Sequence, residues 1–198
     1  MLDYEKIYNG PASVKKVDAS WERYRFAKES ADKMPMRYAW SIEHLFGSVL
    51  DVGAGDGYGA YLMTKNKNIT SITCLEIQDA AIKKMDRHLR KYNNIRIVKG
   101  AIENIDLGIA FNCVHCGHTL EHVEDLEQAM RGLVRHCRDR IVISVPINGG
   151  VNRMHLREFV SDEQVISLVE KYFKPIEYKH FSKGNDVYSL VITAKPYG

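Results

Sequence analysis

The segment Val49-Leu50-Asp51-Val52-Gly53-Ala54-Gly55-Asp56-Gly57 joins a short apolar run to a glycine-rich turn, and a helical segment through Ala60 and Met63 follows. Glycine adopts positive φ angles and has no Cβ, so a ligand can lie against the main chain of such a turn at the start of a helix. Glu76 ends the next apolar run, where a carboxylate accepts hydrogen bonds from both hydroxyls of a ribose. The pattern predicts a site for an adenosine-bearing cofactor at the carboxyl ends of parallel strands.

The rest of the composition is typical of one globular domain. The chain has 198 residues, of which 45% are hydrophobic and 27% charged, and it is long enough to bury a sizeable core. The net charge of +3 is too small to indicate a dedicated nucleic-acid or membrane surface. No apolar run approaches the roughly 18 residues of a membrane-spanning helix, and the N-terminus lacks the plan of a signal peptide.

Apolar runs and helical segments alternate from Val49 onward, which favours an α/β fold. Five runs are expected to form strands, at residues 49–52, 71–77, 95–98, 111–116 and 140–145. Two extended runs, 176–181 and 187–194, flank the hairpin signal Lys183-Gly184-Asn185-Asp186. We predict a Rossmann-like doubly wound sheet of seven strands with an antiparallel C-terminal hairpin and helices on both faces. Residues 1–46 are expected to form a helical cap broken near Pro35, and residues 47–198 the core of a single domain.

Three of the expected helices carry an apolar stripe that would pack on the sheet. One has Ala81, Met85 and Leu89 at helical spacing, and a second runs from Leu126 to Cys137. The third opens at Ser161 with Gln164 three residues on, which is the spacing of a capping box, and it ends before Pro175.

S-adenosylmethionine and nicotinamide dinucleotides both bind at turns of this kind, so the remaining residues must distinguish them. The dinucleotide fingerprint has a third glycine where this chain has Tyr58. Asp51 and Asp56 flank the turn, where carboxylates repel a pyrophosphate and attract a sulfonium with an ammonium group. These residues favour S-adenosylmethionine.

Several motifs resemble those of the class I S-adenosylmethionine-dependent methyltransferases. Residues 49–57 are similar to the family's first motif, Leu75-Glu76-Ile77 to its ribose-binding motif, and Thr119-Leu120-Glu121-His122-Val123-Glu124-Asp125 to the stretch after its fourth strand. His155-Leu156-Arg157-Glu158-Phe159 and Glu22-Arg23-Tyr24-Arg25-Phe26-Ala27 resemble segments of members that act on small molecules and saccharides. The resemblance implies methyl transfer to an oxygen or nitrogen of such a molecule, with S-adenosylhomocysteine as product.

The resemblance and the turn together give an expected set of cofactor contacts. Tyr24 is expected to roof the methionine half of the cofactor, while Ala101 and Ile102 lie where the family meets adenine. Because this chain has Gly100-Ala101-Ile102-Glu103 there, adenine would be held by main-chain groups or by Glu103. The full set of expected contacts is Tyr24, Asp51, Gly53, Ala54, Gly55, Gly57, Tyr58, Glu76, Ile77, Ala101, Ile102 and His118.

The expected catalytic residues are His118, Glu121, His122 and His155. The first three follow the fourth strand, at the crevice where open α/β sheets bind ligands, and a histidine suits proton removal from a methyl acceptor. Alternatively, Glu121 and His122 cap the following helix. Arg157 either holds an anionic acceptor or, as we favour, pairs with an acid on the solvated surface.

Cys113, His115, Cys116, His118 and His122 fall within ten residues and suggest zinc at first sight. A zinc-binding pair of cysteines needs a tight turn. Residues 111–116 instead read as a strand, where alternation sends Cys113 and His115 to one face and Cys116 to the other. We therefore predict no metal ligands. All four cysteines, which include Cys74 and Cys137, are expected to be buried thiols in a reducing, cytoplasmic compartment.

Two other functions stay open at this point. One is an NAD(P)-dependent oxidoreductase, against which Tyr58 and the terminal hairpin count. The other is a non-catalytic module that binds S-adenosylmethionine. Within the methyltransferases, a protein or RNA acceptor also stays open, and no membrane partner is expected.

Overall fold

A seven-stranded sheet of order β3-β2-β1-β4-β5-β7-β6 forms the centre of the computed structural model, which describes residues 34–149, 155–184 and 187–197. Its parallel strands are β1 (Gly47–Val52), β2 (Ile69–Glu76), β3 (Ile95–Lys99), β4 (Phe111–Gly117) and β5 (Cys137–Ile147). The antiparallel strands β6 (Phe173–Gly184) and β7 (Val187–Pro196) complete one edge. The predicted fold class is confirmed.

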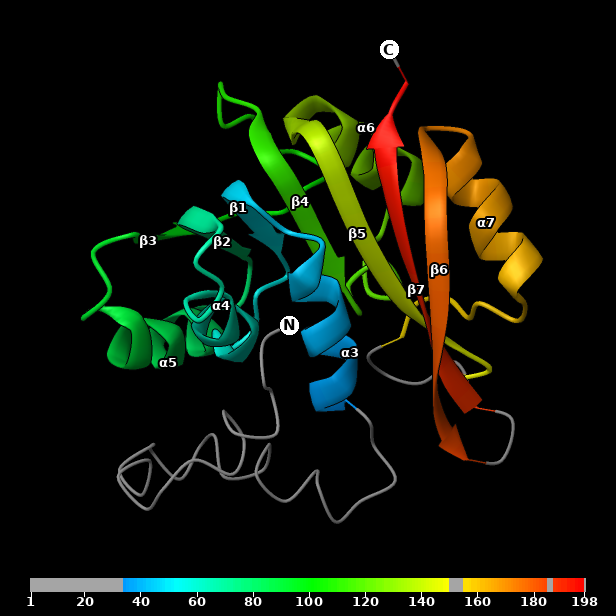
Figure 1. The fold of residues 1–198 in the computed structure, drawn as a ribbon, viewed down its shortest axis with the longest axis horizontal. Coiled ribbons are helices and arrows are strands. Elements are labelled where there is room, and N and C mark those ends of the chain that lie inside the picture. The colour runs from blue at the N-terminus through cyan, green and yellow to red at the C-terminus, as the bar shows by residue number, and fades with distance from the viewer. Residues whose placement is uncertain (1–33, 150–154, 185–186, 198) are drawn as a thin grey trace.

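Helices cover both faces of this sheet (Figure 1). The helices α3 (Met34–Glu43), α4 (Tyr58–Met63) and α5 (Asp79–Leu89) lie on one face, and α6 (Leu126–His136) and α7 (Asp162–Glu170) lie on the other. None of the helices in the described ranges has the length and apolarity needed to cross a bilayer.

Two apolar cores result from the alternation of side chains along the strands. In β1, Leu50 packs into the core under α6 and α7, whereas its neighbour Val49 packs into the core under α3, α4 and α5. In β4, Cys116 belongs to the first core and Cys113 to the second. The prediction that these two cysteines point to opposite faces is therefore confirmed.

The start of α7 follows the predicted cap with one difference. Ser161 Oγ accepts a hydrogen bond from the Gln164 N–H at 3.3 Å, as a capping box requires. Gln164 Oε1, however, accepts from the N–H of Val160 at 2.9 Å, one residue before the cap. The chain entering the helix is thus held on both sides.

Part of the predicted N-terminal cap lies within the described residues. Within the described residues, helix α3 spans Met34–Glu43 and contains Pro35, near which the cap was expected to break. It packs against α4 and β7 and brings Arg37 and Tyr38 toward the middle of the sheet. Residues 1–33, which include Tyr24, lie outside the described residues.

The four cysteines are free and buried. Burial raises the pKa of the Cys113 thiol to about 11 and that of Cys137 to about 12. It raises the pKa of Cys74 and Cys116 well above the ordinary range. Because the thiolate is the reactive form, all four thiols are chemically inert in the folded protein.

We expect native protein at pH 8 to react negligibly with a thiol-specific disulfide reagent. In denaturant, all 4 cysteines should react with it. One fast-reacting thiol in the native protein would contradict this assignment.

Since folding favours the neutral thiols, their contribution to stability is complete below the ordinary thiol pKa of 9.0 and is lost as the pH rises through about 11. The free energy of unfolding, measured in urea, should fall across that range.

Candidate active site

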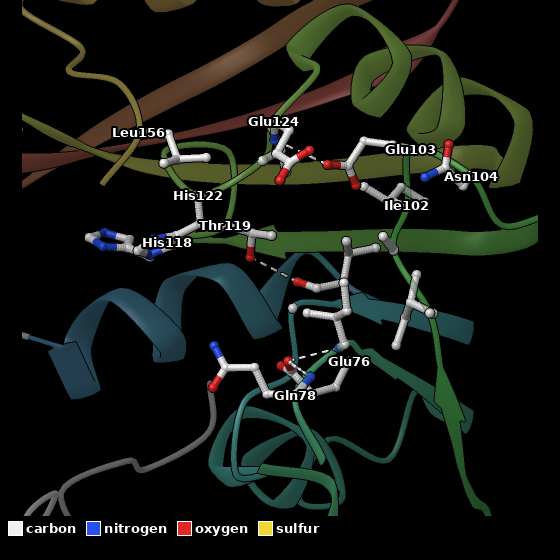
Figure 2. A pocket seen from close by; sticks show the side chains of 17 residues that line it. Glu76, Gln78, Ile102, Glu103, Asn104, His118, Thr119, His122, Glu124 and Leu156 are labelled. Carbon is white, nitrogen blue, oxygen red and sulfur yellow. Dashed lines mark hydrogen bonds between the residues drawn. The ribbon is translucent and has the colours of Figure 1, made fainter. Parts of the chain in front are cut away.

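A cavity of about 630 Å³ opens at the carboxyl ends of β1, β2, β3 and β4, on the side where open α/β sheets bind ligands. Figure 2 shows Glu76 and Gln78 across the cavity from Glu124 and Leu156. The lining comprises Val52, Gly53, Leu75, Glu76, Ile77, Gln78, Gly100, Ala101, Ile102, Glu103, Asn104, His118, Thr119, His122, Val123, Glu124 and Leu156. Six of the expected cofactor contacts are therefore together, namely Gly53, Glu76, Ile77, Ala101, Ile102 and His118.

The glycine turn has the predicted backbone. Gly53, Gly55 and Gly57 have φ angles of 67°, 58° and 87°. A Cβ at Gly53 would lie 2.3 Å from Oγ1 of Thr119, whose hydroxyl donates to the Val52 carbonyl at 3.0 Å. The turn is thus pressed against the end of β4, which only a residue without a side chain permits.

The Glu76 carboxylate accepts three hydrogen bonds from the main chain. One carboxylate oxygen accepts from the N–H of Gly55 at 2.8 Å. The other accepts from the N–H groups of Ile77 and Gln78, both at 2.9 Å. Three main-chain donors from two loops thus hold a carboxylate with only 7% exposure at the wall of the cavity. Its position at the end of β2 is the predicted one.

The loop after β3 forms the wall next to Glu76. Gly100 to Asn104 all line the cavity, with Ile102 almost fully buried. Glu103 Oε1 accepts from the N–H of Glu124 at 3.3 Å, so this loop is joined to the loop after β4. Both predicted means of holding adenine, main-chain groups and Glu103, are present in the wall.

Asp51, one of the expected cofactor contacts, is not among the residues that line the cavity. It is paired in register with His115 of β4, and His115 Nδ1 lies 2.7 Å from Asp51 Oδ1 with both side chains buried. Strand alternation places both on the α3 face, where the Tyr38 ring lies 5.8 Å from the His115 ring. The pair joins neighbouring strands beneath the turn.

Tyr58, another expected cofactor contact, is also outside the lining, and its side chain packs in the core on the α3 face. It is buried, and its ring meets that of Tyr38 edge-on at 6.0 Å. Tyr58 is the first residue of α4, and its side chain belongs to the core between that helix and α3. Ala54, Gly55 and Gly57 lie in the same turn and are also outside the lining.

His118 follows β4 with a left-handed backbone, φ 51°. Its Nε2 lies 2.6 Å from Nη1 of Arg37 and 3.0 Å from Oγ of Ser189. Its Nδ1 lies 3.4 Å from Oε1 of Glu121. Because a guanidinium only donates, Nε2 is the acceptor, and the proton of the neutral ring is on Nδ1, facing Glu121.

Sequence reasoning missed Arg37 and Ser189. Both are buried, and Arg37 Nη1 donates to Ser189 Oγ at 2.8 Å. They come from α3 and β7, at the two ends of the described chain, and no motif links them to the residues after β4. An arginine and a serine at amphipathic positions carry no local signal for such a contact.

Glu121, His122 and His155 form a second group of side chains. They lie at the end of the cavity lined by His118 and His122, which we call the histidine end. Glu121 is buried, with 1% exposure, and His122 Nε2 lies 3.9 Å from its Oε1. The rings of His122 and His155 are 5.0 Å apart. All four predicted catalytic residues are therefore neighbours, although only His118 and His122 line the cavity.

The main chain brings His155 to this group. The N–H of Leu156 donates to the Glu121 carbonyl at 2.8 Å. Arg157 donates to the carbonyls of Leu120 and Glu124, each at 3.1 Å. The expectation that Arg157 pairs with an acid on a solvated surface is therefore wrong, because its guanidinium joins two loops through carbonyl groups.

The alternative role of Glu121 and His122 as helix caps is also wrong. Asp125 is the residue that caps α6, and its side chain accepts from the Gln128 N–H at 3.0 Å. Glu121 and His122 precede this cap and point toward His118 and His155 instead.

The family model and the relatives that this chain resembles are methyltransferases. Residues 50–143 match the family model described as a methyltransferase domain. The ubiquinone biosynthesis O-methyltransferase of Rickettsia bellii is 25% identical over 147 residues, which are 72% of this chain and 58% of that protein. The chain thus matches little more than half the length of this relative.

Two solved structures show the same fold. The N-methyltransferase NodS of Bradyrhizobium japonicum in complex with S-adenosylhomocysteine superposes with a TM-score of 0.69 at 15% identity, covering 98% of this chain and 97% of NodS. The 1,6-didemethyltoxoflavin-N1-methyltransferase of Burkholderia thailandensis gives a TM-score of 0.70 at 20% identity, covering 94% and 89%.

We expect Gly57→Ala to lower the free energy of unfolding by about 2 to 4 kcal/mol, because it combines backbone strain with overpacking. The added Cβ would lie 2.6 Å from Cγ of Met85 and 2.7 Å from Cδ1 of Leu89. Gly108→Ala is the matched control, since Gly108 has φ 67° but open space around it. Urea unfolding should show a loss of only about 1 kcal/mol for this control, and equal losses would refute the packing contribution.

Proposed function

We propose that this chain, a member of the class I S-adenosylmethionine-dependent methyltransferases, is an enzyme that transfers a methyl group to an oxygen or nitrogen of a small molecule or saccharide. The observation that carries the proposal is the Glu76 carboxylate, which three main-chain N–H groups hold at the cavity wall. A ribose with two adjacent hydroxyls supplies the donors that such a carboxylate accepts. The cofactor is S-adenosylmethionine, and the product S-adenosylhomocysteine leaves the same cavity.

The cavity has two chemically different ends. At one end, Glu76 and the Gly100–Asn104 loop offer a carboxylate and main-chain groups to the adenosine half of the cofactor. At the other end, His118 and His122 line the cavity, with Glu121 and His155 beside them. We assign this histidine end to the methyl acceptor.

Methyl transfer is an in-line displacement at carbon. The acceptor lone pair forms a bond to the methyl carbon while the carbon–sulfur bond breaks and its electron pair stays on sulfur, so the sulfonium becomes a neutral thioether. The acceptor loses one proton in the process. The imidazoles at the histidine end promote that loss, which is the role of general base catalysis, and the cavity walls align the acceptor with the methyl group.

The state of the cysteines supports a proposal for the cellular compartment. All four cysteines are free thiols in the cores, which is typical of a reducing compartment. We therefore place the chain in the cytoplasm, with a small-molecule or saccharide acceptor as its partner.

We expect calorimetric titration to detect binding of S-adenosylhomocysteine and S-adenosylmethionine, and no binding of NAD or NADP. Glu76→Ala should weaken binding by about 10- to 100-fold, which is the worth of hydrogen bonds to a charged group. Asp86→Asn is the control, because Asp86 is an exposed acid paired with Arg90 and lies away from the cavity. Binding of the dinucleotides alone would support the oxidoreductase instead.

A second experiment addresses catalysis. Protein incubated with methyl-labelled S-adenosylmethionine and a panel of phenols, sugars and amines should label at least one acceptor. His122→Ala should lower kcat for that acceptor by about 10²- to 10⁴-fold, the usual contribution of assisted proton removal. His44→Ala should not, since His44 lies outside the lining and faces Glu177 at 3.1 Å. Equal turnover by the His122 variant and the wild type would exclude a catalytic role for this histidine.

A further inference from the structure

We infer that Glu121, His122 and His155 bind a first-row divalent metal ion at the histidine end of the cavity. Each residue offers one ligand atom, and these atoms lie within 4.8 Å of one another. The sequence analysis predicted no metal ligands, because it tested only the cluster around β4. His155 lies 33 residues after His122, and only the fold brings them together. The binding of the ion is independent of the proposed function, whereas its use in methyl transfer rests on it.

The distances suit a shared ion. Metal bonds to imidazole nitrogen and carboxylate oxygen are about 2.0 to 2.2 Å long, so two ligands of one ion lie at most about 4.2 Å apart. Glu121 Oε1 and His122 Nε2 are already 3.9 Å apart. The ligand atom of His155 lies within 4.8 Å of both of them, close to the separation that one shared ion requires.

Burial and chemistry both favour a cation here. Glu121 has 1% exposure, and a buried carboxylate needs compensation by positive charge or by donors. Two imidazoles and one carboxylate are a ligand set that suits zinc, manganese, iron or cobalt and leaves coordination positions open. Magnesium and calcium prefer ligand sets made of oxygen.

The surrounding residues orient these ligands. His118 presents its Nδ1–H to Oε1 of Glu121, and Arg37 fixes that tautomer from the other side of the ring. Neighbouring groups of this kind set the direction of a metal-binding carboxylate. Arg157 holds the segment that carries His155 against the carbonyls of Leu120 and Glu124. The three ligands therefore stand on loops that are fastened to one another.

The ion would act on the acceptor. His122 and Leu156 line the cavity, so the open coordination positions face the space assigned to the acceptor. With the ion bound, His122 acts as a ligand and no longer as a base. A hydroxyl that coordinates the ion has a lower pKa and loses its proton to solvent more readily, which leaves an oxygen nucleophile for the methyl carbon. This favours an oxygen acceptor, and above all one that carries two adjacent oxygens.

A second cluster in the structure provides the matched control. His180 Nε2 lies 2.6 Å from Oδ2 of Asp162, and the Tyr188 hydroxyl donates to the other carboxylate oxygen at 2.7 Å. This cluster contains one histidine and one carboxylate and lies outside the lining of the cavity. Its histidine is half-exposed, so its replacement should leave the fold intact.

The experiment is a titration of chelator-treated full-length protein with cobalt(II), followed by its visible absorption, and with zinc(II), followed by calorimetry. We expect one ion per chain. His155→Ala and His122→Ala should each weaken binding by more than about 100-fold, since even residues that only orient metal ligands are worth 10- to 100-fold. Arg157→Ala should weaken it by about 10-fold, and His180→Ala should bind as the wild type does.

S-adenosylhomocysteine binding, measured on the same variants, separates the two proposals and reports on folding. Two results would overturn the metal site alone, provided that S-adenosylhomocysteine still binds. One is that no ion binds, and the other is that the wild type and the His155 and His122 variants bind it equally. Ion binding that depends on these histidines in a protein that binds no sulfur nucleoside would support the metal site and overturn the proposed function.

Discussion

The parallel pairing of β1 with β4 is the constraint on which the rest of the site depends. Chain order reverses at this pair, so β1 leads toward β2 and β3 while β4 leads toward β5. The register sets Asp51 opposite His115, and their buried hydrogen bond of 2.7 Å holds the two strands beneath the site. The glycine turn follows β1 and the His118 loop follows β4, so the two loops lie side by side. Gly53 approaches the Thr119 side chain so closely that a Cβ at Gly53 would clash with it.

Sequence pattern predicted the elements well because each has a local cause. Apolar periodicity located the strands and α5 to α7, and Glu76 was found because it ends a strand at a fixed distance from the turn. Side-chain direction was harder. Asp51 and Tyr58 were expected to contact the cofactor, and alternation in β1 and the core under α4 place both outside the lining of the cavity. Arg37 and Ser189 could not be found, since only the assembled sheet places them beside His118.

The histidine end holds two buried side chains of opposite charge. Arg37 and Glu121 are both buried, and charges removed from water are stable only when geometry compensates them. His118 stands between the two, accepting from the guanidinium and presenting its proton to the carboxylate. Helix α3 and strand β7 are thereby tied to the loop after β4.

The two ends of the cavity differ in how they are built. Around Glu76, recognition rests on main-chain N–H groups and on glycines without side chains, all within one continuous stretch of the sequence. The histidine end is made of side chains from α3, β7 and two loops. Substitutions can therefore change the histidine end one side chain at a time, while the end around Glu76 keeps its shape. For the enzyme proposed above, this division lets acceptor preference diverge in evolution while one methyl donor is retained.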